Sequence, residues 1–188
     1  MEKAVSPQLN KRLADRLANN IEGKVLFDVF TRGRYSTDAS IYQVTPIGVV
    51  IPKTLRDLVS AVEIAVDENV PILPRGGGTS QCGQTVNEAV VIDCSQHLNK
   101  IIDFDYQGKK ITVEPGIVLD HLNAYLKPHN LFFPVDISTA SRATIGGMTA
   151  NNSCGARSIH YGIMVDNVCS IDALLPNGGQ ALFAETPK

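Results

Sequence analysis

Hydrophobic positions near the start of the chain follow a helical period and then a strand-like run. Leucines recur every four residues from Leu9 to Leu17, directly after Ser6-Pro7, which is a typical helix start. This spacing predicts a helix over residues 7–20, because residues four apart share one face of a helix. Residues 48–51 form a continuous apolar run closed by a proline, and we interpret them as a buried strand.

A second amphipathic helix is predicted after this strand. Thr54 and Asp57 form a start similar to a capping box, and apolar residues then keep a period near 3.6 to about Asn69. The period is carried by Leu55, Leu58, Val59, Val62 and Val66. Residues 70–73 are a second apolar run, so residues 48–73 are predicted to form a β-α-β unit. A glycine-rich stretch begins where this strand ends, and open α/β sheets bind ligands at that end of their strands.

The rest of the chain is predicted to consist of short strands and helices with short connections. Strands are expected at residues 89–94, 101–105 and 110–114, a helix at 118–127, a short helix at 146–152 and a hairpin at 168–184 that turns at Asn177-Gly178-Gly179. The predicted fold class is α+β with two subdomains. A small β-α-β part would face a larger mixed or antiparallel sheet with helices, and a ligand would lie between the two.

Two glycine-rich segments indicate where that ligand binds. The first glycine loop, residues 76–84, begins with Gly76-Gly77-Gly78, and the second glycine loop, residues 143–155, contains Gly146-Gly147. Three consecutive glycines cost conformational entropy, so a plain turn seldom carries all three. Glycine lets the backbone approach a ligand closely, and successive N–H groups then form an anion-binding concavity. We expect the first loop and the amino end of a helix at Gly146 to share a dinucleotide pyrophosphate.

Two other nucleotide-binding motifs do not fit the first glycine loop. The dinucleotide pattern GxGxxG starting at Gly76 needs a glycine where the chain has Gln81. The spacing from Gly78 to Gly83 matches a Walker A loop, but Gln84 stands where that motif has its lysine. Both motifs also need a helix directly after the loop, whereas a strand is predicted to follow. We therefore reject both.

Composition and charge exclude several classes of partner. The 188 residues carry a net charge of −2, and 44% of them are apolar. These values, without any long basic block, argue against nucleic acid and anionic membrane as partners. No apolar stretch is typical of a signal peptide or reaches the roughly 20 residues of a membrane span. The four cysteines and four histidines show no metal-ligand spacing, so we expect no metal, free thiols and a cytoplasmic location.

Together with their flanking motifs, the glycine loops resemble the FAD-binding PCMH-type domain of the vanillyl-alcohol oxidase / p-cresol methylhydroxylase flavoprotein family. The matching pieces are residues 49–52 (VVIP), 71–80 (PILPRGGGTS), 113–116 (VEPG), 144–148 (TIGGM), 161–162 (YG) and 174–178 (LLPNG). Within the family, residues 34–38 (RYSTD) and 151–158 (NNSCGARS) are most similar to D-lactate and D-2-hydroxyglutarate dehydrogenases, FAD-linked oxidases that include large forms with iron–sulfur domains.

This resemblance implies a non-covalently bound FAD and assigns residues to it. The pyrophosphate and ribityl chain would be wrapped by Arg75, Gly76, Gly77, Gly78, Thr79, Ser80, Gly83 and Gln84. The other side would be lined by Pro134, Ser138, Ala143, Thr144, Gly146, Gly147, Asn152, Gly155 and Ala156. Family members that bond the flavin through histidine carry it at the position of Thr79, which cannot form that bond. As alternatives, Pro134 would only rigidify a bend and Asn152 would only cap a turn. Cys154 would be a small side chain that serves packing and not redox chemistry.

The resemblance also implies an activity, the oxidation of a small D-2-hydroxy acid by hydride transfer to flavin. Residues 1–34 would be an N-terminal helix and lead-in, and residues 35–188 a FAD-binding domain incomplete at its C-terminal end. The family's substrate-binding domain, with its catalytic base, would be absent, so we expect this chain alone to be inactive. Within the chain, His160 and Arg157 are the nearest candidates for chemistry.

Two alternatives stay open at this point. One is a nucleotide-binding module without catalysis. The other is a different flavoenzyme of the same superfamily, such as an aldonolactone oxidase or the reductase of peptidoglycan precursor synthesis. The sequence leaves the electron acceptor open.

Overall fold

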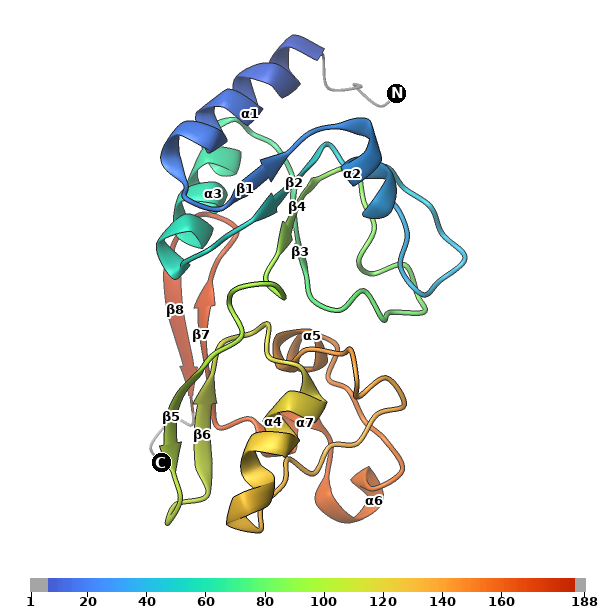
Figure 1. The fold of residues 1–188 in the computed structure, drawn as a ribbon, viewed down its shortest axis with the longest axis vertical. Coiled ribbons are helices and arrows are strands. Elements are labelled where there is room, and N and C mark those ends of the chain that lie inside the picture. The colour runs from blue at the N-terminus through green and yellow to red at the C-terminus, as the bar shows by residue number, and fades with distance from the viewer. Residues whose placement is uncertain (1–6, 185–188) are drawn as a thin grey trace.

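The computed structural model describes residues 7–184 and arranges them as two stacked subdomains (Figure 1). The first contains α1 (Pro7–Asn20), β1 (Lys24–Leu26), α2 (Val29–Arg34), β2 (Gly48–Ile51), α3 (Leu55–Asp67), β3 (Ile72–Arg75) and β4 (Val90–Asp93). The second contains β5 (Ile101–Asp105), β6 (Lys110–Val113), α4 (Leu119–Leu126), the 3₁₀ turn η1 (Lys127–His129), α5 (Ile145–Ala150), α6 (Ser158–Tyr161) and α7 (Met164–Asn167). The hairpin of β7 (Ser170–Leu174) and β8 (Gln180–Ala184) runs beside both subdomains. The predicted α+β class is confirmed.

A four-stranded sheet in the order β1-β2-β4-β3 forms the centre of the first subdomain. β2 and β3 each pair in parallel with β4, with Gly48 and Ile72 both opposite Val90, and β1 pairs antiparallel with β2. All residues of β2 and β4 are buried, as is typical of central parallel strands. Grouping residues 89–94 with the later antiparallel strands was wrong, because the sheet partners of β4 are the two strands that precede it in the chain.

The N-terminal helix α1 belongs to the core of the first subdomain. Leu13 and Leu17 are fully buried and lie in one cluster with Val50 of the sheet, which confirms the predicted helix and its apolar face. Ser6 and the side chain of Leu9 lie outside the described residues. The domain boundary expected at residue 34 stays a prediction.

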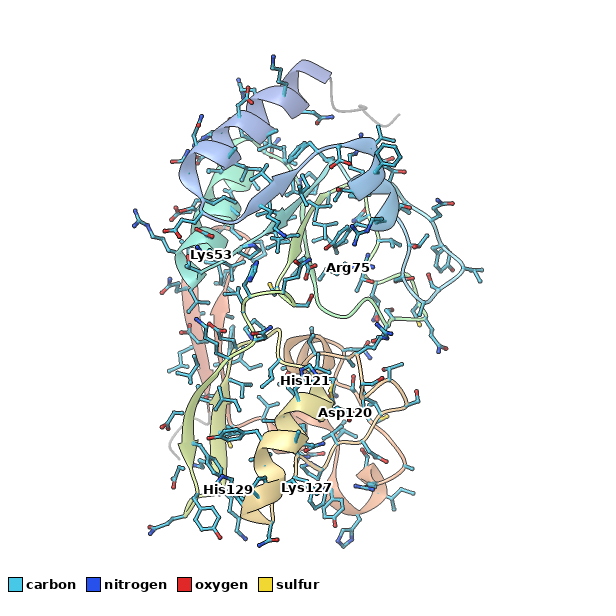
Figure 2. All side chains as sticks on the ribbon, in the orientation of Figure 1. Lys53, Arg75, Asp120, His121, Lys127 and His129 are labelled. Atoms are coloured by element: carbon cyan, nitrogen blue, oxygen red, sulfur yellow. The ribbon has the colours of Figure 1, made fainter. Side chains whose placement is uncertain are left out.

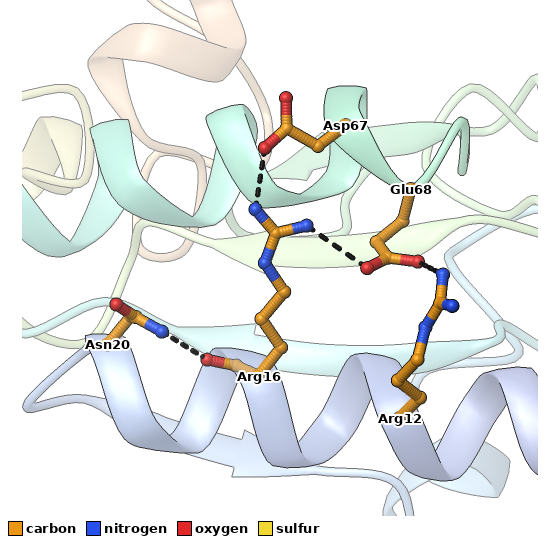
Figure 3. Close-up of polar contacts among 5 residues, drawn as sticks. All are labelled: Arg12, Arg16, Asn20, Asp67 and Glu68. Carbon is orange, nitrogen blue, oxygen red and sulfur yellow. Dashed lines mark hydrogen bonds and ion pairs between the residues drawn. The ribbon is translucent and has the colours of Figure 1, made fainter.

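Ion pairs connect α1 to the end of α3 at the surface (Figure 3). The Arg16 guanidinium lies 2.6 Å from a carboxylate oxygen of Asp67 and 3.0 Å from one of Glu68, and Arg12 also pairs with Glu68. Because both arginine side chains are well exposed, each pair stabilises the fold by at most about 1 kcal/mol. Burial of the leucine face therefore contributes more to the position of α1 than these ion pairs do.

Helix α3 begins at the predicted cap. The Thr54 side chain accepts a hydrogen bond from the Asp57 backbone N–H at 3.1 Å. The apolar face differs in part from the predicted one, since Leu55 is 54% exposed and Val66 is 40% exposed. The residues buried on this helix are Asp57, Ala61, Val62, Ile64 and Ala65. Alanine carries little hydrophobic signal in a sequence, and this hid the true buried face.

The second subdomain has its own core between α4 and α5. Leu119, Leu122 and Leu126 of α4 are buried there with Ile145 and Met148. Among the described residues, β5-β6 and β7-β8 form two separate two-stranded antiparallel sheets, where one larger sheet was expected. Helices α2, α6 and α7 were not predicted, because runs of four to six residues are too short to show a helical period. No described helix is both long and apolar enough to cross a membrane.

Candidate functional site

A cleft of about 570 Å³ lies between the two glycine loops. The predicted cofactor-binding residues that line it are Gly76, Gly77, Gly78, Thr79, Ser80, Gln84, Ser138, Ala143, Thr144, Gly147 and Asn152. The volume lies within the range of small-molecule and cofactor sites. No charged side chain of the described residues lines the cleft, so an anionic ligand there must be held by backbone and neutral polar groups.

The first glycine loop presents free backbone donors to this cleft. Within residues 7–184, the backbone N–H groups of residues 76–80 have no hydrogen-bond acceptor. Backbone N–H groups nearly always have a partner, so these five are available to a ligand or to water. Gly78 has φ of +66°, a conformation that favours glycine and changes the direction of the chain within the loop. This run of free donors is compatible with an anion-binding concavity, and that role of the first loop stays a prediction.

The start of helix α5 does not offer donors in the same way. The Gly146 N–H donates to the Pro115 carbonyl at 2.8 Å, and the Gly147 N–H donates to Thr144 Oγ1 at 3.3 Å. The Met148 N–H donates to the Thr144 carbonyl at 2.8 Å. The protein itself supplies acceptors for these three donors. The sharing of a pyrophosphate by the amino end of this helix stays a prediction.

Six of the predicted residues lie outside the lining of the cleft: Arg75, Gly83, Pro134, Gly146, Gly155 and Ala156. The three glycines among them face protein atoms. A β-carbon at Gly83 would lie 2.6 Å from the Tyr42 ring, one at Gly146 would lie 2.6 Å from Pro115, and one at Gly155 would overlap the Asp136 carbonyl. These glycines allow close packing of the walls behind the cleft.

Arg75 lies at the end of β3, where the first glycine loop begins (Figure 2). Its guanidinium donates to three backbone carbonyls, those of Tyr35 at 3.2 Å, Thr37 at 2.8 Å and Thr85 at 3.1 Å. The guanidinium also lies over the Tyr35 ring, 5.2 Å from its centre. Arg75 therefore ties both ends of the first loop to the segment after α2.

Asp38 makes a second connection between this segment and the loop. Its carboxylate accepts hydrogen bonds from the Ser40 N–H at 2.8 Å and from the Thr85 hydroxyl at 3.0 Å. Burial alone would raise the pKa of Asp38, but these hydrogen bonds outweigh it and hold the pKa below its usual range. The Ala39 N–H donates to the Gly78 carbonyl at 3.2 Å. Residues 35–40 are thus part of the structure that shapes the loop.

Several lining residues were not predicted to bind the cofactor. They are Leu73, Pro74, Thr85, Ile137, Thr139, Met148, Ala150, Asn151, Ser153 and Cys154. Most are direct neighbours of predicted positions, so a longer motif window would have included them. Ile137 and Thr139 flank the predicted Ser138, and nothing in their residue types marks them as binding residues.

The two residues considered for chemistry line neither this cleft nor the smaller pocket described below. The Arg157 backbone N–H donates to Asp136 at 2.9 Å, and its guanidinium lies over the Phe132 ring. His160 packs edge-on against the Tyr161 ring, 4.5 Å between centres. Within residues 7–184, no three His, Cys, Asp or Glu side chains gather as a metal site would require.

Comparison with known proteins agrees with this geometry. Residues 46–181 match the family described as FAD binding domain. D-2-hydroxyglutarate dehydrogenase of Haemophilus influenzae is 35% identical over 92% of this chain, and that of Escherichia coli is 40% identical over 76% of it. The solved structure of p-cresol methylhydroxylase with substrate bound superposes with a TM-score of 0.76 at 20% identity, covering 97% of this chain and 36% of that one.

The chain spans only 17% and 14% of the length of the two dehydrogenases. The match therefore concerns one part of those proteins. An extended cleft with free backbone donors and no charged lining also fits a dinucleotide cofactor held through its pyrophosphate. The chain belongs to the FAD-binding domain family of flavin-linked oxidoreductases, with the PCMH-type fold, and its cofactor is FAD.

Proposed function

We propose that this chain is the FAD-binding part of an enzyme that oxidises a D-2-hydroxy acid, D-2-hydroxyglutarate or D-lactate. The relatives that support this are named D-2-hydroxyglutarate dehydrogenase in two bacteria and D-lactate dehydrogenase [cytochrome] 1 in Saccharomyces cerevisiae, which is 29% identical over 93% of this chain. The described cysteines are all unpaired, which supports a reducing compartment and, within it, the cytoplasm.

The run of free N–H groups at residues 76–80 carries the placement of the cofactor. We place the FAD pyrophosphate against these five donors, because successive backbone N–H groups stabilise a dianion without a charged side chain. The ribityl chain and ring would then run along residues 138–154, where Ser138 and Asn152 present neutral polar groups. Pro134, Gly155 and Ala156 lie outside the lining and would contribute by shaping the protein wall behind it.

In this assignment Arg75 is a positioning residue. Its three carbonyl contacts hold the backbone in the conformation that points the N–H groups of the loop at the cofactor. The loop would thus be preorganised, and binding would cost little ordering entropy. FAD supplies a hydride acceptor when bound, and the residues described here bind and orient it.

Substrate oxidation also needs a base and a cation for the substrate carboxylate. The described lining of the cleft contains neither, so we propose that both come from parts of the enzyme that correspond to the remaining length of its relatives.

The test has two stages, which separate cofactor binding from activity. First, FAD is titrated into this chain, and binding is followed by quenching of flavin fluorescence and by the visible spectrum. Second, dye reduction is measured for this chain and for a longer chain that includes the flanking regions, with D-lactate, D-2-hydroxyglutarate, their L-enantiomers and sugar lactones. We expect at best weak FAD binding by this chain, tighter FAD binding by the longer chain, and dye reduction with the D-2-hydroxy acids by the longer chain only.

If neither of the two chains binds FAD, the cofactor placement is contradicted. Reduction with lactones, or equal rates with both enantiomers, would contradict the substrate class while leaving the cofactor placement intact. Turnover by this chain at the rate of the longer one would contradict our placement of the base and the cation.

A further inference from the structure

A second pocket of about 370 Å³ adjoins the cofactor cleft. The two cavities have only Gly76 and Gly77 in common among their lining residues. These glycines pack against Thr144 and Arg142 of the opposite loop, so the contact between the loops separates the cavities. The smaller pocket is therefore a distinct site and not an extension of the cleft.

Unlike the cleft, the smaller pocket is lined by charged residues. Arg34, Arg75 and Arg142 contribute to it. The Arg75 guanidinium is bound to three backbone carbonyls, as described above. In contrast, the side chains of Arg34 and Arg142 make no hydrogen bond or ion pair with any residue in the described part of the chain. Both are solvent-accessible, so a ligand from solution can reach them.

The one carboxylate in the lining, that of Asp93, already accepts hydrogen bonds from the protein. Asp93 accepts hydrogen bonds from the Tyr35 hydroxyl at 2.5 Å and from the N–H and hydroxyl of Ser95 at 2.8 and 2.6 Å. Burial, followed by the hydrogen bond to Asp93, raises the pKa of Tyr35 to about 12, so its phenol stays a donor near neutral pH. The three arginines of the lining outnumber this one carboxylate, so the pocket keeps an excess of positive charge.

We propose that this pocket binds a small oxyanion, a carboxylate or a phosphate, through Arg34 and Arg142. The planar guanidinium matches both groups, because it donates two parallel hydrogen bonds to a pair of oxygens. The volume is near the lower end of ligand sites, which fits a small acid and not a second nucleotide. The oxyanion would bind independently of FAD, because the linings of the pocket and the cleft share only Gly76 and Gly77.

Isothermal titration calorimetry at constant ionic strength tests this with two probes, inorganic phosphate and malonate. We expect saturable binding of at least one probe. Arg34→Gln and Arg142→Gln should each weaken it by about tenfold, which corresponds to about 1.4 kcal/mol. Arg56→Gln is the matched control, since Arg56 is an exposed arginine of α3 outside the pocket, and it should leave affinity unchanged. Thermal melts establish that each variant is folded.

The two probes and the cofactor give outcomes that decide the proposal. Tighter binding of phosphate or of malonate identifies which oxyanion source the pocket prefers, and equal binding supports recognition of the shared chemistry. No binding of either probe would overturn the proposal, as would equal effects of all three substitutions. FAD-saturated protein should bind the probe with unchanged affinity, and displacement of the probe by FAD would overturn the separation of the two sites.

Discussion

Gly77 packs directly against the backbone of Arg142, so that a β-carbon at position 77 would overlap the Arg142 carbonyl oxygen. Gly76 has the same relation to the Thr144 side chain. The two glycine loops therefore touch where they line the cleft, and glycine is required there for contact between the subdomains. Gly147 differs, because only Thr144 Oγ1, 3.2 Å away, lies near the place of its β-carbon.

This difference predicts that a substitution at Gly77 lowers stability, whereas a substitution at Gly147 lowers FAD binding. Gly77→Ala should lower the free energy of unfolding by about 1–3 kcal/mol, the usual cost of forcing an extra carbon into a packed region. Gly147→Val should leave that free energy within about 1 kcal/mol of the parent, because, apart from adjacent residues and the helix backbone, Thr144 Oγ1 is the one described protein atom within 4 Å of the added β-carbon and needs to move only slightly. It should remove FAD binding, because Gly147 lines the cleft. Chemical denaturation without FAD and flavin fluorescence quenching measure the two effects.

The stability prediction for Gly77 and the FAD-binding prediction for Gly147 can be contradicted independently. A Gly77→Ala protein as stable as the parent would show that the loops do not touch in solution. A Gly147→Val protein with unchanged FAD affinity would show that the cofactor does not run along the second glycine loop.

Arg75→Lys tests whether the first loop is held from behind. Lysine keeps the charge but replaces the planar fork with a compact ammonium, which cannot reach three carbonyls in fixed positions. We expect a loss of about 2 kcal/mol in stability and a weaker affinity for FAD, since hydrogen bonds to charged groups contribute about 1.5–3 kcal/mol each. Arg56→Lys, an exposed site on α3, is the control and should change neither. Unchanged FAD affinity in Arg75→Lys would contradict a positioning role.

Local patterns were enough to predict much of this fold. The strand Gly48–Ile51, the Thr54 cap and the hairpin around Asn177-Gly178 each depend on neighbouring residues, and all are present. The position of β4 in the sheet could not be predicted this way, because strand order depends on long-range pairing. Helices α2, α6 and α7 were also hidden, since four to six residues do not complete two turns.

Motif reading led to the two glycine loops that line the cleft but did not distinguish the roles of their residues. Glycines that approach a ligand and glycines that approach protein look identical in a sequence, and only the neighbours of the missing β-carbon separate Gly147 from Gly155. In the same way, Arg75 sits inside the phosphate-binding motif, yet its contacts are carbonyls from residues far along the chain. Such contacts require the tertiary structure.

Tyr35 should titrate well above the usual pKa of a phenol. Burial and the hydrogen bond to Asp93 raise its pKa to about 12, from about 10 in an unfolded chain. Because the folded state holds this proton more tightly, its contribution to stability is complete below about pH 10 and is lost as the pH rises through about 12. Near-ultraviolet absorbance of phenolate should show one late step, and Tyr35→Phe should remove it. If the absorbance difference between the parent and Tyr35→Phe is complete at about pH 10, in protein with native circular dichroism, the prediction is contradicted.

Thr79 leads to the last prediction, that FAD is bound without a covalent bond. A bond to the flavin ring needs a nucleophilic side chain beside it, and neutral threonine is a weak nucleophile. Within the described lining, Cys154 is the one thiol, and no histidine is present. Acid precipitation of the FAD-loaded protein should therefore leave all flavin in solution. A yellow pellet would contradict the prediction, and its loss in Cys154→Ser with retention in Thr79→Ala would assign the bond to the cysteine.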